Sequence, residues 1–164
     1  MLSPQLASHA SHLARSQRLM WAALTAALGI WALLPFQLEA VAARATPALL
    51  GPLLAAAAAT AGLASLLLHR RTHAPERLRA RIPTGTAGAA RECAVVQGLQ
   101  GLVAPWVACL ALNESIAIFG LVLALLRGEP AHGLPFAAAA LGLNLAMFPR
   151  PALFAERALA GSGL

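Results

Sequence analysis

The residues best suited to chemistry lie together in one apolar segment, residues 103–126, with the sequence VAPWVACLALNESIAIFGLVLALL. Glu114 is the one formally charged residue of this segment, and Asn113 and Ser115 flank it near the middle. A carboxyl group can bind a proton or a cation, and amide and hydroxyl groups can complete such a site. The pattern therefore predicts a buried, protonatable acid with polar neighbours.

The segment is long enough to cross a lipid bilayer. As a helix, its 24 residues would span roughly 36 Å, compared with about 30 Å for the hydrocarbon core. An acid at that depth needs a partner, because lipid offers a carboxylate neither water nor hydrogen bonds. It should therefore face protein or a water-filled pocket, pair with a polar group, or carry a proton.

No positively charged residue is expected near Glu114, because the chain has no Lys and no Arg lies within its apolar runs. We therefore expect a hydrogen-bonding group on another helix to pair with Glu114, and Asn144 or Thr60 would serve. The predicted ion-binding site consists of Glu114, Ser115, Asn113 and Asn144.

Composition places the chain among membrane proteins. Of its 164 residues, 59% are hydrophobic and 11% are charged, compared with about 25% charged residues in an ordinary soluble domain. Four apolar runs, separated by polar or Pro- and Gly-containing turns, predict four transmembrane helices in one domain. These runs cover residues 19–38, 48–68, 103–126 and 132–148.

The first run allows a second interpretation. Arg15 and Arg18 precede it, and residues 40–42 (Ala-Val-Ala) resemble a signal-peptide cleavage site. The run is longer than the usual apolar core of about 7–15 residues, and Trp31 and Pro35 interrupt it. We favour a retained helix and leave the signal peptide as the alternative.

Arginine positions predict the orientation. Ten of the twelve Arg lie in the tail at residues 1–18, the loop at residues 69–91 and the tail at residues 149–164. Only Arg44 and Arg127 lie on the other side. By the positive-inside rule, both termini are cytoplasmic. The sequence thus predicts an all-α, integral membrane four-helix bundle in a bacterial inner (plasma) membrane, with both termini in the cytoplasm.

Two groups of residues are expected to contact neighbours in the membrane. The basic loop at residues 69–91 should contact lipid head groups through Arg70, Arg71, Arg77, Arg79 and Arg81. Small residues at four-residue spacing let helix backbones approach closely in lipid. The predicted packing residues are Gly51, Ala55, Ala59, Gly62 and Gly120.

Motifs for other functions are missing from the sequence, which has no phosphate-binding loop, no CxxC or HExxH motif and no nucleophile paired with a base. Cys93 and Cys109 lie about 24 Å apart along one predicted helix, too far for a disulfide. Basic residues flank the apolar runs and form no single patch, which argues against nucleic-acid binding. We therefore expect no enzyme activity, cofactor or metal site, and we identify no small-molecule substrate.

The sequence from Asn113 to Leu126 resembles the ion-carrying helix of rotary ATPase proteolipids, the c-type ring subunits. In that family a mid-membrane Glu is followed by a small residue, an aliphatic pair, an aromatic residue, Gly and a Leu- and Val-rich stretch. The matching positions here are Glu114, Ser115, Ile116, Ile118, Phe119, Gly120, Leu121 and Val122. The family's Glu binds and releases H⁺ or Na⁺, so the resemblance implies that role for Glu114.

Two functions from different classes follow. The leading prediction is a non-enzymatic structural or accessory subunit of a membrane assembly, which contacts the lipid bilayer and either other membrane subunits or further copies of itself. The alternative is a proteolipid-like subunit that translocates protons or sodium ions through Glu114. A membrane enzyme or haem anchor is a remote third case, because no two His share a mid-membrane level.

Overall fold

The computed structural model describes residues 4–38, 47–72, 74, 76, 88–151, 153 and 156. None of these residues forms a strand, so the all-α prediction is confirmed for the part of the chain that the structure describes. In chain order, the elements are α1 (Pro4–Gln37), α2 (Leu50–Thr72), α4 (Gly88–Gln100), α5 (Val103–Arg127), the 3₁₀ helix η1 (Pro130–Gly133) and α6 (Leu134–Ala146).

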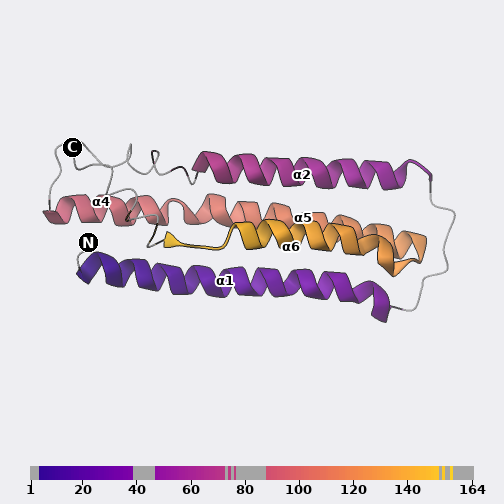
Figure 1. Cartoon of the computed structure of the whole chain (residues 1–164), viewed down its shortest axis with the longest axis horizontal. Helices are drawn as coiled ribbons and strands as arrows, with labels where there is room; N and C mark the ends of the chain where they lie inside the picture. The colour runs from indigo at the N-terminus through magenta and orange to yellow at the C-terminus, as the bar shows by residue number, and fades with distance from the viewer. Residues whose placement is uncertain are drawn as a thin grey trace.

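The helices lie side by side along one long axis (Figure 1). Helices α1, α4 and α5 run in one direction, and α2 and α6 return in the other (Figure 1). The start of α1, the end of α2, all of α4 and the end of α6 therefore share one end of the bundle, which we name the α4 end. The opposite end, where α1 and α5 finish and α2 begins, also holds η1 and is named the η1 end.

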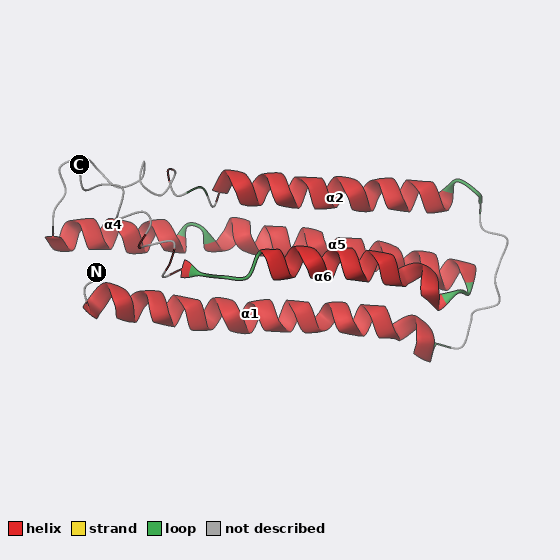
Figure 2. Cartoon of the chain, in the orientation of Figure 1, coloured by secondary structure: helices red, strands yellow, loops and turns green. Residues whose placement is uncertain are grey.

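Helix α5 is the central element, because it packs against α1, α2, α6 and η1. Half of the apolar window in residues 90–127 is buried, compared with 11% in α1 and 17% in α2. Helices α4 and α5 are separate, since the helix is interrupted at Gly101 and Leu102 (Figure 2). Pro105 then falls in the first turn of α5, where its missing N–H is tolerated. Helix α5 ends as predicted at Arg127, before Gly128 with φ 67°.

In the part of the chain that the structure describes, three segments are long and apolar enough to cross a membrane: Ala7–Gln37, Leu50–Thr72 and Ala90–Arg127. Helix α6 has 13 residues, or about 20 Å, which is less than the roughly 30 Å of a hydrocarbon core. The predicted fourth run at residues 132–148 thus corresponds to part of η1, the short helix α6 and the turn that follows it. Four crossings remain a prediction.

The bundle surface carries large apolar side chains on every long helix. Lipid solvates exposed apolar side chains well, and large apolar patches are uncommon on soluble monomers. The exposed side chains include Leu19, Ile30, Leu33, Phe36, Leu53, Leu63, Leu67, Ile118, Leu126 and Leu145.

The helices extend beyond the predicted apolar runs. Residues 4–18, expected to form a polar tail, continue α1, and their face with Ala10 and Gln17 is buried. Helices α2 and α4 likewise extend into the expected loop at residues 69–91. Ala, Leu, Gln and Arg have high helix propensity, so these polar segments can form helices wherever another helix supports them. The suggested cleavage site at residues 40–42 lies outside the described residues.

Candidate functional site

Three consecutive polar side chains of α5 point in different directions, because successive residues of a helix are about 100° apart. Asn113 is fully buried, and Glu114 is half-buried. The hydroxyl of Ser115 donates a hydrogen bond to the carbonyl oxygen of Ala111 in its own helix, at 3.0 Å. The three residues therefore do not converge on one ion-binding position.

Glu114 pairs with α1. The indole Nε1–H of Trp31 donates a hydrogen bond to Glu114 Oε1, at 3.0 Å. Trp31 also packs against a buried apolar cluster that contains Leu28 and Ile116. An indole N–H is a donor only, and a carboxyl oxygen is a suitable acceptor for it. The pair therefore links α1 to α5 within an apolar part of the bundle.

Asn113 and Asn144 form a second link, between α5 and α6. Asn113 Nδ2 donates to Asn144 Oδ1 at 2.8 Å, and both residues are at most 1% exposed. Asn144 Nδ2 lies 3.5 Å from Thr25 Oγ1, which extends the chain of polar groups to α1. Asn113 Oδ1 has no hydrogen-bond partner among the described residues. Together these side chains tie three helices around one buried point.

Ser65 forms a third link, between α2 and α5. Its hydroxyl donates to the carbonyl oxygen of Cys109 at 3.1 Å, and Cys109 Sγ lies 3.5 Å from the carbonyl oxygen of Ser65. Met147 Sδ completes the cluster, at 3.7 Å from Ser65 Oγ and 3.5 Å from Asn113 Nδ2. Met147 thus joins the second and third links.

Two tryptophans bind the end of α6. The last carbonyl groups of a helix lack partners within the helix. Trp21 Nε1 donates to the carbonyl oxygen of Asn144 at 2.8 Å, and Trp106 Nε1 donates to that of Met147 at 3.0 Å. These indoles fix α6 against α1 and α5.

The expected partners of Glu114 were wrong. Asn144 pairs with Asn113, and Thr60 is exposed and donates to the carbonyl oxygen of Ala56 in its own helix. Trp31 was missed as a partner because a tryptophan in an apolar run fits packing equally well. The signal available in the sequence was the indole N–H of Trp31, a donor near the middle of the first apolar run that needs a partner when it is buried.

Four of the five predicted packing residues lie at three kinds of position in the bundle. A Cβ atom at Gly120 would lie 2.5 Å from the Cβ atom of Phe136 and 2.9 Å from the carbonyl oxygen of Gly133, so α5 and the η1–α6 segment meet closely there. Gly62 faces Ile116 of α5. Ala55 and Ala59 line an open apolar groove of about 490 Å³ between α2 and α6.

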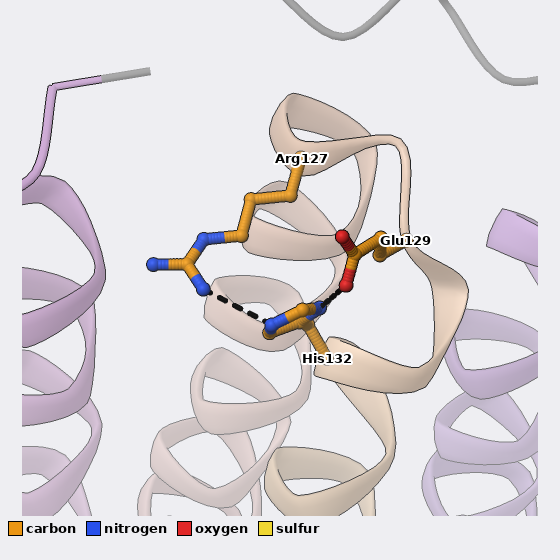
Figure 3. Close-up of polar contacts among 3 residues, drawn as sticks. All are labelled: Arg127, Glu129 and His132. Carbon is orange, nitrogen blue, oxygen red and sulfur yellow. Dashed lines mark hydrogen bonds and ion pairs between the residues drawn. The ribbon is translucent and has the colours of Figure 1, made fainter. Parts of the chain in front are cut away.

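At the η1 end, Arg127, Glu129 and His132 form a polar cluster (Figure 3). Arg127 Nη1 lies 3.0 Å from His132 Nε2, and His132 Nδ1 lies 3.0 Å from Glu129 Oε2. A guanidinium only donates hydrogen bonds, so His132 Nε2 is the acceptor in its contact with Arg127. The Arg127 guanidinium also lies against Gly51 of α2, where a Cβ atom would be 2.9 Å from Nη2.

Most of the arginines that the structure describes lie toward the opposite, α4 end. Arg70 and Arg71 are exposed there, at the end of α2. The other predicted lipid contacts, Arg77, Arg79 and Arg81, lie outside the described residues. Within the described ranges, no group of three or more His, Cys, Asp or Glu could hold a metal ion.

Comparisons of the chain with models of protein families, with curated proteins and with solved structures found no match. The resemblance to rotary ATPase proteolipids continues to depend on the residues around Glu114 alone. An ion-carrying role for Glu114 accordingly stays a prediction.

Proposed function

We propose that this chain is a multi-spanning membrane protein that serves as a non-enzymatic structural or accessory subunit of a membrane assembly. The observation that carries the proposal is that interior polar side chains make hydrogen bonds between helices. Glu114 and Asn113 of α5 make hydrogen bonds to α1 and α6, and Ser65 of α2 makes one to α5, so α5 is linked to three neighbouring helices. Polar contacts of this kind hold helices together in lipid, where burial of apolar surface provides little driving force.

The distribution of charge supports a bacterial inner-membrane location with the α4 end in the cytoplasm. Helices α1, α2, α4 and the segment after α6 bring Arg15, Arg18, Arg70, Arg71, Arg91 and Arg150 toward that end. Arg127 is the one described arginine at the η1 end. This asymmetry agrees with the positive-inside rule.

A fourth crossing is consistent with the lengths of η1 and α6 taken together. The four residues of η1 add about 8 Å to the roughly 20 Å of α6, for a total near 28 Å. We therefore place α6 in the bilayer beside α5, with both chain termini on the cytoplasmic side.

Substitution of Glu114 tests the proposed role. Glu114→Gln keeps a side-chain oxygen that can accept the Trp31 hydrogen bond, whereas Glu114→Leu removes it. We expect Glu114→Gln to purify from mild detergent with the same associated proteins as the unmodified chain, and Glu114→Leu to lose stability and association. The measurements are thermal unfolding and identification of the co-purified proteins.

The ion-carrier alternative predicts a different pattern. Glu114→Gln would then abolish ion movement in reconstituted vesicles while assembly stays intact. A carbodiimide would label Glu114, and Na⁺ or high pH would suppress the labelling. That combination would overturn the structural role.

A further inference from the structure

A cavity of about 270 Å³ lies at the α4 end, where α1, α2, α5 and the segment after α6 meet. This volume is just below the range of about 300–1,000 Å³ that is usual for small-molecule sites. The cavity is therefore large enough for a polar headgroup and the beginning of an alkyl chain, but not for a whole lipid.

Gln17 of α1 lines this cavity and distinguishes it from a packing defect. Gln17 is 8% exposed as a whole residue, and its amide atoms are not among the buried polar atoms that lack a partner, so solvent reaches the amide at the cavity. This amide offers two N–H donors and one carbonyl acceptor to a group bound in the cavity. Gln17 and His69 line the cavity, whereas the interior side chains of Ser65, Asn113 and Asn144 bind neighbouring helices.

One arginine lines the cavity, and a second lies beside it. Arg150 lines it and is exposed to solvent. The guanidinium carbon of Arg18 lies 5.8 Å from the ring centre of Phe148, which also lines the cavity. Guanidinium groups form bidentate hydrogen bonds with phosphate oxygens. The cavity mouth is therefore suited to a phosphate-bearing group.

The apolar lining of the cavity and its level in the membrane also suit a lipid. Leu13, Leu99, Leu102 and Trp106 line the interior of the cavity. At Arg18, the sequence of α1 changes from polar to apolar, so the cavity lies at the level where a bilayer surface would be. We propose that this cavity binds the anionic headgroup of a phospholipid together with the first part of its alkyl chain, with Gln17, Arg150 and Arg18 as the polar contacts.

Lipid retention tests the proposal, which rests on the membrane location but not on the accessory-subunit role. The full chain is reconstituted in nanodiscs of phosphatidylglycerol and phosphatidylcholine, extracted in mild detergent and analysed by native mass spectrometry. We expect one phosphatidylglycerol to be retained, and Gln17→Leu or Arg150→Gln to reduce its retention about tenfold, as loss of one charge-assisted hydrogen bond would. Arg70→Gln is the matched control for general head-group attraction, because Arg70 is a predicted head-group contact at the same end that does not line the cavity.

Three results would overturn the proposal. One is equal retention of phosphatidylglycerol by Gln17→Leu, Arg150→Gln and Arg70→Gln. Another is equal retention of phosphatidylcholine and phosphatidylglycerol. The third is that soluble glycerol phosphate alone raises the unfolding temperature as much as phosphatidylglycerol does, which would identify a free anion as the ligand. Ala146→Phe, which places a ring at the cavity wall, gives a second variant and should also lose the retained lipid.

Discussion

Trp31 Nε1 lies 3.0 Å from Glu114 Oε1, and this contact joins the first apolar helix to the central one. The two residues share a depth in the bundle. Trp31 lies ten residues, or about 15 Å, beyond Trp21, and Glu114 lies eight residues, or about 12 Å, beyond Trp106. Trp21 and Trp106 both bind the end of α6, so the acid lies about half a bilayer thickness below the level of that end.

Close approach of α5 to the η1–α6 segment should make Gly120 intolerant of a side chain. Gly120→Ala places a methyl group against Phe136 and against the backbone of Gly133. We expect Gly120→Ala to lower the free energy of unfolding in detergent by about 1–3 kcal/mol, as overpacking does in other cores.

Gly142 provides the control for that substitution, because a Cβ atom there would meet nothing within 4 Å. Gly142→Ala should be neutral or stabilise the protein by up to about 1 kcal/mol, through the higher helix propensity of Ala. Equal effects of the two substitutions would show that α5 and the η1–α6 segment do not meet as described.

The buried amide pair should contribute to stability. Asn113→Leu removes the hydrogen bond to Asn144 Oδ1 and leaves that oxygen without its donor. We expect a loss of about 1–3 kcal/mol in the free energy of unfolding. Thr60→Ala is the control, since that exposed hydroxyl bonds within its own helix and its loss should cost less than about 0.5 kcal/mol. A smaller loss for Asn113→Leu than for Thr60→Ala would contradict the described pair.

The two native cysteines allow a direct test of orientation. Cys93 is exposed in α4 and Cys109 is buried, so a membrane-impermeant maleimide should label Cys93 alone. We expect labelling in inside-out vesicles and none in intact spheroplasts. In a Cys93→Ser background, Ala131→Cys at the exposed η1 end should show the reverse pattern. Labelling of Cys93 in intact spheroplasts would invert the proposed topology.

The helical class and the bounds of α5 could be predicted because both follow from local patterns. A run of apolar residues sets the length of a helix, and Arg127-Gly128-Glu129-Pro130 sets its end through the left-handed conformation of Gly128. The short length of α6 could not be predicted in the same way. Its apolar run includes Pro135 and continues through Met147, and the position of η1 decides where the helix begins.

The hydrogen-bond partners of Asn113 and Glu114 could not be predicted from the sequence. Helical rotation places Asn113 and Glu114 on different sides of α5, but it does not say which helix each side meets. Trp31 and Asn144 became their partners because α1 and α6 pack on those sides. The proposed role of Gln17 likewise depends on α1 beginning before its apolar run. The polar composition of residues 4–18 predicts a tail there, so the sequence did not indicate this extension.

A double-mutant cycle on Trp31 and Glu114 tests most directly the claim that the central acid links helices. Trp31→Phe removes the indole N–H and keeps an aromatic ring, and Glu114→Leu removes the acceptor. We expect the two losses in the free energy of unfolding to be non-additive, with a coupling energy of about 0.6–1.7 kcal/mol, as found for interhelical hydrogen bonds in membranes. Additive losses, with no measurable coupling, would contradict the account.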